Sequence, residues 1–223
     1  MRIGILGGTF NPIHFGHLRA AEEVRESLRL DKVIFIPSGM PPLKDSDIAS
    51  QDLRLKMTSL AVSANPYFEV SDIEVRRSGR SYTVETIAEL MGIYPKDEMI
   101  FILGIDAFLD LPHWKSPKRL VSLTDFAIIS RPGLSFESLR GAEFLDTEKD
   151  ALSALDNKET GLYEAFLEGG RKAYLINITP FYISATDIRR RIRGGLSIKY
   201  MLPETVESFI ILNGIYKRPE DQG

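Results

Sequence analysis

Short apolar runs of strand length alternate with segments of helical period along most of the chain, and this alternation limits the fold more than any other feature. Residues 3–6 and 33–36 are continuous apolar runs, and between them Leu, Ala and Val recur at helical spacing from about Gly16. Further strands are predicted at 68–75, 99–103, 126–129 and 174–176, and further helices at 53–64 and 84–91. Strands that alternate with helices predict an α/β protein with a mainly parallel sheet covered on both faces.

The stretch from about Leu134 to Lys172 departs from this alternation, because it is rich in Glu, Asp, Gly and Ser and its apolar residues are sparse. We predict a surface excursion from the sheet there, at about 134–172, within a single domain that spans residues 1–223. Its apolar residues indicate one or two short helices at Leu152, Leu155, Leu162, Phe166 and Leu167.

The C-terminal part returns to helical patterns. Ser184 has the character of an N-cap, with Asp187 three residues further on. A last helix is expected after Pro203, and Gly214 supplies its stop signal. We therefore predict a C-terminal helical segment at about 184–216.

Composition excludes several classes of protein. The chain has 223 residues with 28 Lys and Arg against 31 Asp and Glu, so it lacks the basic surplus of a protein that coats nucleic acid. It contains no cysteine, which excludes disulfides, thiolate metal sites and cysteine nucleophiles. There is no apolar run of about 18 residues and no signal-peptide pattern. We expect a cytoplasmic protein with neither a nucleic-acid partner nor a membrane partner.

The densest chemical signal is the turn between the first strand and the first helix, which reads GGTFNPIHFGH over residues 7–17. Glycines let backbone N–H groups approach an anion, and the N-terminus of the helix adds partial positive charge. His14 and His17 lie three residues apart, so both rings are expected on one side, where they can donate to phosphate oxygens. The alternatives are an ordinary glycine turn with a capping histidine, or a zinc site, for which no third ligand is evident.

The residues His14-Phe15-Gly16-His17 resemble the H-x-G-H signature of the nucleotidyltransferase superfamily, whose fold is related to the class I aminoacyl-tRNA synthetase core. Six further blocks, in this order, resemble the bacterial nicotinate-nucleotide adenylyltransferases. These blocks are 41–44 (PPLK), 81–86 (SYTVET), 104–106 (GID), 112–114 (PHW), 183–189 (ISATDIR), and 202–204 (LPE) with 214–216 (GIY). The resemblance implies a Rossmann-like doubly wound parallel sheet of the nucleotidyltransferase type, with a C-terminal helical part.

The reaction that this resemblance implies is transfer of the adenylyl group of ATP to nicotinic acid mononucleotide, giving deamido-NAD and pyrophosphate. The 5′-phosphate of the mononucleotide attacks the α-phosphorus in line, with Mg²⁺ carried by ATP and no metal ligand from the protein. Because the attacking phosphate is already ionised, the protein must supply positioning and charge stabilisation but no nucleophile. A homo-oligomer is compatible with the sequence.

Other functions stay open at this point. The same chemistry serves other acceptors, namely nicotinamide mononucleotide, phosphopantetheine and riboflavin phosphate (FMN), and a non-catalytic ATP-binding module would use the same sheet. A function related to tRNA is disfavoured by the acidic charge balance.

By this resemblance, His17 stabilises charge on the α-phosphate and His14 helps to hold the phosphates. Lys44 and Arg189 would neutralise phosphate charge. Other candidates for ATP and phosphate binding are Gly7, Gly8, Thr9, Phe10, Gly104, Ser184 and Thr186. Alternatively, Lys44 is a solvated loop lysine, and Arg189 belongs to a solvated arginine run over residues 189–193.

Three residues are candidates for binding the mononucleotide. Trp114 would hold the flat pyridine ring, Thr83 at a helix start would bind the nicotinate carboxylate, and Asp106 would hold a ribose hydroxyl. The alternatives are a core tryptophan, an ordinary first-turn threonine and a helix-capping aspartate. One departure is Leu43, where relatives usually carry histidine, so no phosphate contact is expected there.

Overall fold

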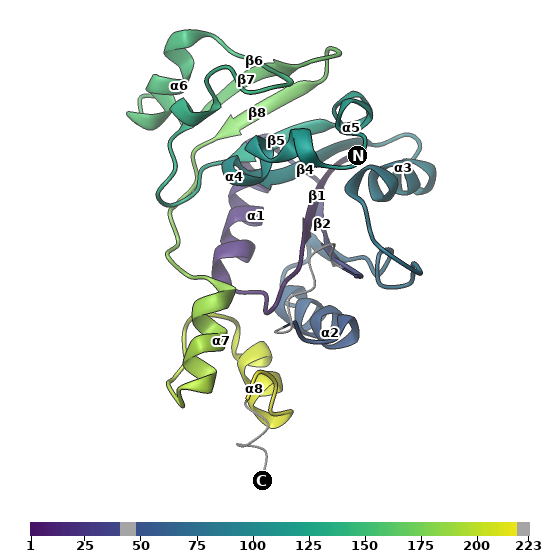
Figure 1. The fold of residues 1–223 in the computed structure, drawn as a ribbon, viewed down its shortest axis with the longest axis vertical. Coiled ribbons are helices and arrows are strands. Elements are labelled where there is room, and N and C mark those ends of the chain that lie inside the picture. Colours follow the sequence, from purple (N-terminus) through teal and green to yellow (C-terminus); the bar gives the residue numbers. More distant parts are fainter. Residues whose placement is uncertain (41–47, 218–223) are drawn as a thin grey trace. The chain divides into compact units, whose positions relative to one another are not determined.

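The computed structural model describes residues 1–40 and 48–217, which form two compact units (Figure 1). The predicted phosphate ligand Lys44 and its neighbour Leu43 lie outside the described residues. The first unit contains Met1–Gly7, Ala20–Ile34 and Tyr82–Pro180, and the second contains Gly8–Arg19, Phe35–Ser81 and Phe181–Gly223.

The first unit is built on a mainly parallel sheet with the strand order β2-β1-β4-β5-β8-β7-β6. The pairs β1·β4, β4·β5 and β5·β8 are parallel, whereas β7 pairs antiparallel with both β8 and β6. The strands are β1 (Arg2–Gly8), β2 (Lys32–Pro37), β4 (Glu98–Gly104), β5 (Asp125–Ile129), β6 (Leu145–Asp146), β7 (Leu162–Leu167) and β8 (Lys172–Ile176).

The central strands are buried on both faces, which explains why they appear in the sequence as continuous apolar runs. In register, Ile5 pairs with Phe101 and Phe101 with Phe126, and Phe126 is fully buried. Figure 1 shows α1 and α3 on opposite sides of β1. The helices that contribute to this unit are α1 (Phe15–Leu28), α3 (Thr83–Ile93), α4 (Ile105–Leu109), α5 (Pro117–Leu123) and α6 (Lys149–Asp156), with the 3₁₀ turns η1 (Leu111–His113) and η2 (Phe136–Leu139).

The prediction for residues 134–172 was only partly correct. Leu152 and Leu155 lie in helix α6 and are buried, as expected. The expectation of a helix at Leu162–Leu167 was wrong, because this segment forms strand β7. Along β7, exposed Glu164 and Phe166 alternate with buried Ala165, which is the period of a strand. The segment therefore adds strands to the sheet, and the single-domain boundary remains a prediction.

In the second unit, β3 (Phe68–Val70) lies beside the end of β2, where Ser71 N donates to the Phe35 carbonyl at 2.9 Å. This strand is shorter than the predicted 68–75, because the chain turns at once: Ile73 N donates to Ser71 Oγ at 3.3 Å. The helices are α2 (Gln51–Val62), α7 (Ala185–Arg193) and α8 (Glu204–Leu212).

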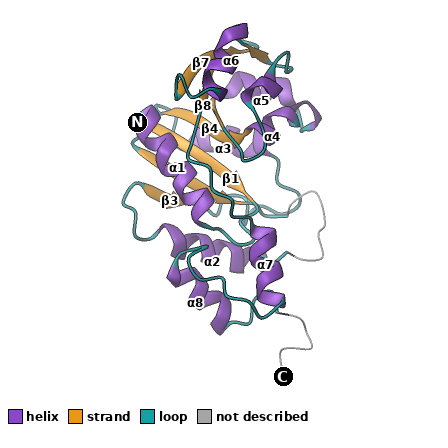
Figure 2. Cartoon of the chain, turned by 90° about the vertical axis from the view of Figure 1, so that its left-hand side faces the viewer, coloured by secondary structure: helices purple, strands orange, loops and turns teal. Residues whose placement is uncertain are grey.

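The C-terminal helices were predicted correctly. Helix α8 packs beside α2 (Figure 2), and Thr205 Oγ1 donates to the Leu60 carbonyl at 3.3 Å. Gly214 follows the helix with a φ of 58°, the left-handed conformation that ends many helices. Over the described ranges, none of the helices has the length and apolar character needed to cross a bilayer.

Candidate functional site

The glycine-containing turn after β1 wraps around one aromatic ring. Phe10 is only 2% exposed and has a φ of 47°. A Cβ atom at Gly8 would lie 2.9 Å from the Phe10 ring, so glycine allows the backbone to pass close to it. The Phe10 ring meets His17 edge-on, with centroids 5.2 Å apart. The buried Phe10 ring therefore supports the backbone of the turn by packing against it.

The two histidines share one side of the turn, as predicted. Their rings stack with centroids 3.8 Å apart at an interplanar angle of 28°. The His14 carbonyl accepts the backbone N–H groups of His17 and Leu18, so His14 directly precedes helix α1 and accepts its first hydrogen bonds. His14 is 6% exposed, whereas His17 is half-buried.

One hydrogen bond determines which ring nitrogen of His17 carries the proton. The backbone N–H of His14 donates to His17 Nδ1 at 3.3 Å. A nitrogen that accepts a hydrogen bond cannot carry the proton, so the neutral ring holds its proton on Nε2. His17 thus presents an Nε2–H donor at the N-terminus of α1, where the helix favours negative charge.

Asn11 supports the turn through hydrogen bonds, and it was not among the site residues predicted from the sequence. Its Oδ1 accepts hydrogen bonds from Ala49 N at 3.0 Å and from the Tyr216 hydroxyl at 2.8 Å. Its carbonyl accepts Arg189 Nη1 at 3.0 Å. Burial raises the pKa of Tyr216 above the usual range of tyrosine, so this hydroxyl stays protonated and donates. No local pattern marks Asn11, because its partners are far away in sequence.

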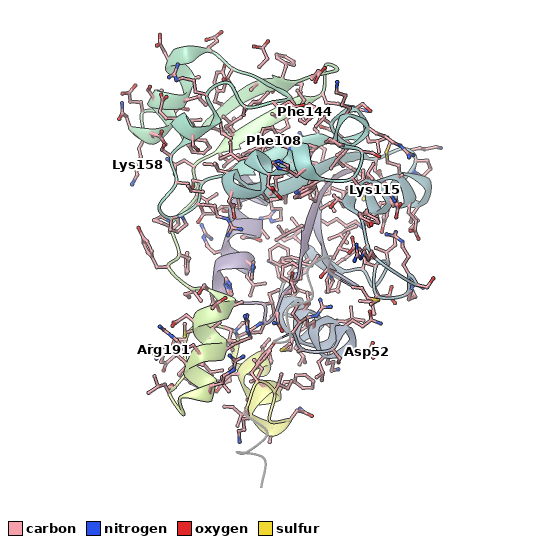
Figure 3. The ribbon with its side chains drawn as sticks, in the orientation of Figure 1. Asp52, Phe108, Lys115, Phe144, Lys158 and Arg191 are labelled. Carbon is pink, nitrogen blue, oxygen red and sulfur yellow. The ribbon has the colours of Figure 1, made fainter. Side chains whose placement is uncertain are left out.

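Arg189 does not lie on a solvated arginine face. It is 8% exposed and points to the Asn11 carbonyl, whereas the Arg190 side chain is 80% exposed. Arg191, which extends from α7 in Figure 3, places its Nε 3.4 Å from Asp187 Oδ2. A phosphate contact from Arg189 remains a prediction.

The predicted cap of α7 is confirmed. Ser184 Oγ accepts the backbone N–H of Asp187 at 3.1 Å, and Ser184 and Thr186 are both exposed in the first turn. These two hydroxyl groups and the two histidines belong to the same unit.

Thr83 is the first residue of helix α3, as predicted. The N-cap Tyr82 makes no side-chain cap bond, so the first N–H groups of the helix can donate hydrogen bonds to an anion. Lys115, labelled in Figure 3, places its Nζ 4.1 Å from the Tyr82 ring centroid and 2.6 Å from Glu85 Oε1. A cation thus lies beside this helix start.

Trp114 is half-buried and held in place by its indole N–H. Its Nε1 donates to Asp110 Oδ2 at 3.1 Å, and its ring lies edge-on to Phe101 at 6.4 Å. These contacts are compatible with either a ring platform or a packing role, so the predicted ring contact stays a prediction.

Asp106 lies in the first turn of α4, at the end of β4. Arg131 Nε donates to Asp106 Oδ1 at 3.1 Å, and a Cβ atom at Gly104 would overlap both side chains. A larger residue at position 104 would therefore displace the ends of these two side chains. Sequence reasoning missed Arg131, although its place just after the carboxyl end of β5 is a signal for a ligand-binding residue.

The structure groups the predicted residues by unit. The second unit holds Gly8, Thr9, Phe10, His14, His17, Ser184, Thr186 and Arg189, and the first holds Gly7, Thr83, Gly104, Asp106 and Trp114. Nearly all residues predicted for ATP thus fall in one unit, and all those predicted for the mononucleotide fall in the other.

Comparison with known proteins identifies relatives of the whole chain. The model of the cytidylyltransferase-like family matches residues 5–191. The probable nicotinate-nucleotide adenylyltransferase of Thermoanaerobacter sp. (strain X514) is 42% identical over 225 residues, covering 100% of this chain and 98% of the relative. The corresponding protein of Dictyoglomus thermophilum is 43% identical over 217 residues, covering 97% and 100%.

Among solved structures, Plasmodium falciparum nicotinic acid mononucleotide adenylyltransferase complexed with NaAD aligns with a TM-score of 0.72. The alignment covers 96% of this chain and 97% of that chain at 19% identity, so it supports the fold alone. The predicted α/β nucleotidyltransferase fold is confirmed. Identity above 40% over whole chains goes further: this chain belongs to the nicotinate-nucleotide adenylyltransferase family, within the cytidylyltransferase-like proteins.

Proposed function

We propose that the protein transfers the adenylyl group of ATP to nicotinic acid mononucleotide, giving deamido-NAD and pyrophosphate in NAD biosynthesis. The observation that carries this proposal is the stacked pair His14 and His17 at the glycine turn, in a chain 42% identical to a probable nicotinate-nucleotide adenylyltransferase. The pair supplies directed donors at the start of a helix, which is the arrangement that an in-line transfer at a phosphate needs.

In the reaction, a 5′-phosphate oxygen of the mononucleotide forms a bond to the α-phosphorus of ATP. The bond from that phosphorus to the pyrophosphate oxygen breaks, and pyrophosphate leaves with its electron pair. The Nε2–H of His17 donates to an α-phosphate oxygen, where negative charge builds in the transition state. No protein atom becomes covalently attached.

The remaining residues of the second unit would hold the phosphate chain. His14 stacks against His17 and shares its side of the turn. Ser184 and Thr186 offer hydroxyl and backbone donors at the start of α7, and Arg189 and Lys44 would neutralise charge. Phe10 acts from inside the turn, since it is buried.

The mononucleotide would use residues of the first unit. The uncapped N-terminus of α3 at Thr83 suits the nicotinate carboxylate, because helix N-termini bind anions. Trp114 would face the pyridine ring and Asp106 a ribose hydroxyl. The ion pair with Arg131 helps to orient the Asp106 carboxylate. Selection of nicotinate over nicotinamide then depends on the charge of the carboxylate.

Mg²⁺ would enter with ATP. Within residues 1–40 and 48–217, no three His, Asp or Glu side chains gather as a metal site. Mg²⁺ keeps several waters and binds readily to substrate phosphates, so an ion held by the triphosphate would need no dedicated set of protein ligands. Its contribution there is to neutralise charge on the phosphate oxygens.

A panel of acceptors tests the proposal. Pyrophosphate release is measured with ATP, Mg²⁺ and, in turn, nicotinic acid mononucleotide, nicotinamide mononucleotide, phosphopantetheine and riboflavin phosphate. We expect the highest kcat/KM with the nicotinate acceptor. An equal or higher value with the amide would contradict the assigned substrate, and tight ATP binding without turnover on any acceptor would favour a non-catalytic module.

The cytoplasmic location and a homo-oligomeric state remain predictions. Sedimentation equilibrium of the purified protein measures the oligomeric state directly.

A further inference from the structure

Arg54 is the largest fully buried side chain among the described residues, and it is 1% exposed. It projects from the first turns of α2, and its guanidinium donates four hydrogen bonds. Nε donates to the Ala49 carbonyl at 3.0 Å, Nη1 to the Thr9 carbonyl at 2.8 Å and Ser38 Oγ at 3.3 Å, and Nη2 to the Gly39 carbonyl at 2.8 Å. All four acceptors are neutral oxygens.

Burial of a cation without a carboxylate in these bonds is costly, and desolvation lowers the pKa of Arg54. The buried guanidinium fixes the relative positions of the backbone groups that it binds. A planar guanidinium holds its donors in a rigid fork, whereas lysine presents a compact charge at the end of a flexible stem. The hydrogen bonds of the guanidinium connect the turn after β1, the residues after β2 and Ala49, two residues before α2.

The hydrogen bond to the Thr9 carbonyl links Arg54 to His17 through Phe10. The Thr9 carbonyl belongs to the peptide unit that enters Phe10, whose φ of 47° turns the chain sharply. The Phe10 ring then packs edge-on against His17 at 5.2 Å. A second link acts at the neighbouring residue, because Ser38 N donates to the Gly8 carbonyl at 2.9 Å.

We propose that Arg54 is a positioning residue for adenylyl transfer: it fixes the Thr9–Phe10 peptide, and through the Phe10 ring it sets the orientation of His17. Arg54 touches no reacting atom in this scheme. The inference rests on the role of His17 in the proposed function.

The kinetic test compares Arg54→Lys with Val62→Ala. Val62 is a buried residue on the same helix, about 12 Å further along its axis, so its truncation lowers stability without touching the turn. For Arg54→Lys we expect kcat to fall by about 10- to 100-fold, because small misplacements of a catalytic group cost that much. We expect KM for the mononucleotide to stay within about twofold of wild type, since its predicted ligands lie in the other unit.

A spectroscopic test reads the histidines directly. The chain has three histidines, and the His113 side chain is 80% exposed, so it serves as an internal reference. In imidazole ¹⁵N–¹³C NMR spectra of Arg54→Lys, we expect the signals of His14 and His17 to shift while the His113 signal stays. In Val62→Ala all three signals should match wild type.

Phe10→Leu provides a second variant if Arg54→Lys fails to fold. It removes the ring that links Thr9 to His17 while Arg54 is retained, so we expect the same loss of kcat and the same shift of the His17 signal. Wild-type kcat or unmoved His17 signals in a folded Arg54→Lys or Phe10→Leu variant would overturn the proposal. If the wild-type protein fails to use the mononucleotide, the proposed function fails, and the NMR comparison still tests the link from Arg54 to His17.

Discussion

One ring nitrogen of His17, Nδ1, accepts a hydrogen bond from the protein backbone, which places the ring proton on Nε2. Its Nδ1 accepts the His14 backbone N–H, and its ring is held between the His14 and Phe10 rings. The tautomer and the orientation are therefore both set by the protein before a nucleotide binds. This preorganisation is what makes a single donor effective at a developing charge.

We predict that His17→Ala lowers kcat by about 10²–10³-fold, as expected for loss of one donor to the transition state. Folding should be nearly unchanged, because His17 is only half-buried and lies in the first turn of helix α1. Steady-state kinetics with both substrates saturating measure the effect. His113→Ala, which removes an exposed ring, is the matched control. Near-wild-type turnover of His17→Ala would refute the assigned role.

Trp114 allows a similar test on the mononucleotide side. Trp114→Ala should raise KM for the mononucleotide by about tenfold, because loss of an aromatic face costs about 1.4 kcal/mol of binding at most. Trp114→Phe should recover most of that loss. Unfolding of Trp114→Ala in circular dichroism would instead assign the indole a packing role against Phe101.

At the scale of elements, two serine residues cap the N-termini of helices in the same way but at different places in the second unit. Ser50 Oγ accepts Leu53 N at the start of α2, and Ser184 Oγ accepts Asp187 N at the start of α7. Each satisfies one of the N–H groups that a helix leaves open at its N-terminus. Only the α7 cap belongs to the predicted phosphate site.

Ser50→Ala and Ser184→Ala are therefore predicted to cost about 1 kcal/mol of stability each, the usual value for loss of a cap. Urea denaturation measures this loss. Ser184→Ala should in addition raise KM for ATP, whereas Ser50→Ala should leave it unchanged. A parallel change of KM in both variants would remove Ser184 from the site.

Element-scale patterns also explain which predictions failed. The apolar run of β4 was recognisable because strands buried on both faces need apolar residues throughout. Strand β7 was mistaken for a helix because its outward face carries the apolar residues Leu162 and Phe166, which obscures the alternation. Its pairing with β8 decides the conformation, and no property of residues 162–167 alone encodes that partner.

At the scale of the whole chain, the C-terminal region supports the N-terminal turn. The Tyr216 hydroxyl donates to Asn11 Oδ1 across 205 residues of sequence, and both residues belong to the second unit. Burial raises the pKa of Tyr216 above the value of about 10 that an unfolded chain gives. The protonated form is therefore favoured in the folded state.

The sign of the pH effect follows from this shift. Below about pH 10 Tyr216 is neutral in both states and its contribution is complete, whereas at higher pH the unfolded state releases the proton first and stability falls. Between about pH 9 and about pH 11, the free energy of unfolding should fall more steeply for wild type than for Tyr216→Phe. Tyr200→Phe, which alters an exposed ring, should follow wild type. Parallel profiles of wild type and Tyr216→Phe would contradict the assignment.

The sequence by itself determined the buried parallel strands, the Ser184 cap, the glycine turn and the position of His14 and His17, because each depends on neighbours within a few residues. Only the tertiary structure revealed Arg54, Asn11 and Tyr216 as supports of that turn. Their hydrogen bonds within and to the turn join segments 38 to 205 residues apart, and an arginine in an ordinary helix pattern gives no local sign that its guanidinium will be buried. Chemistry at the turn is thus encoded locally, whereas its rigidity arises from partners that only folding brings together.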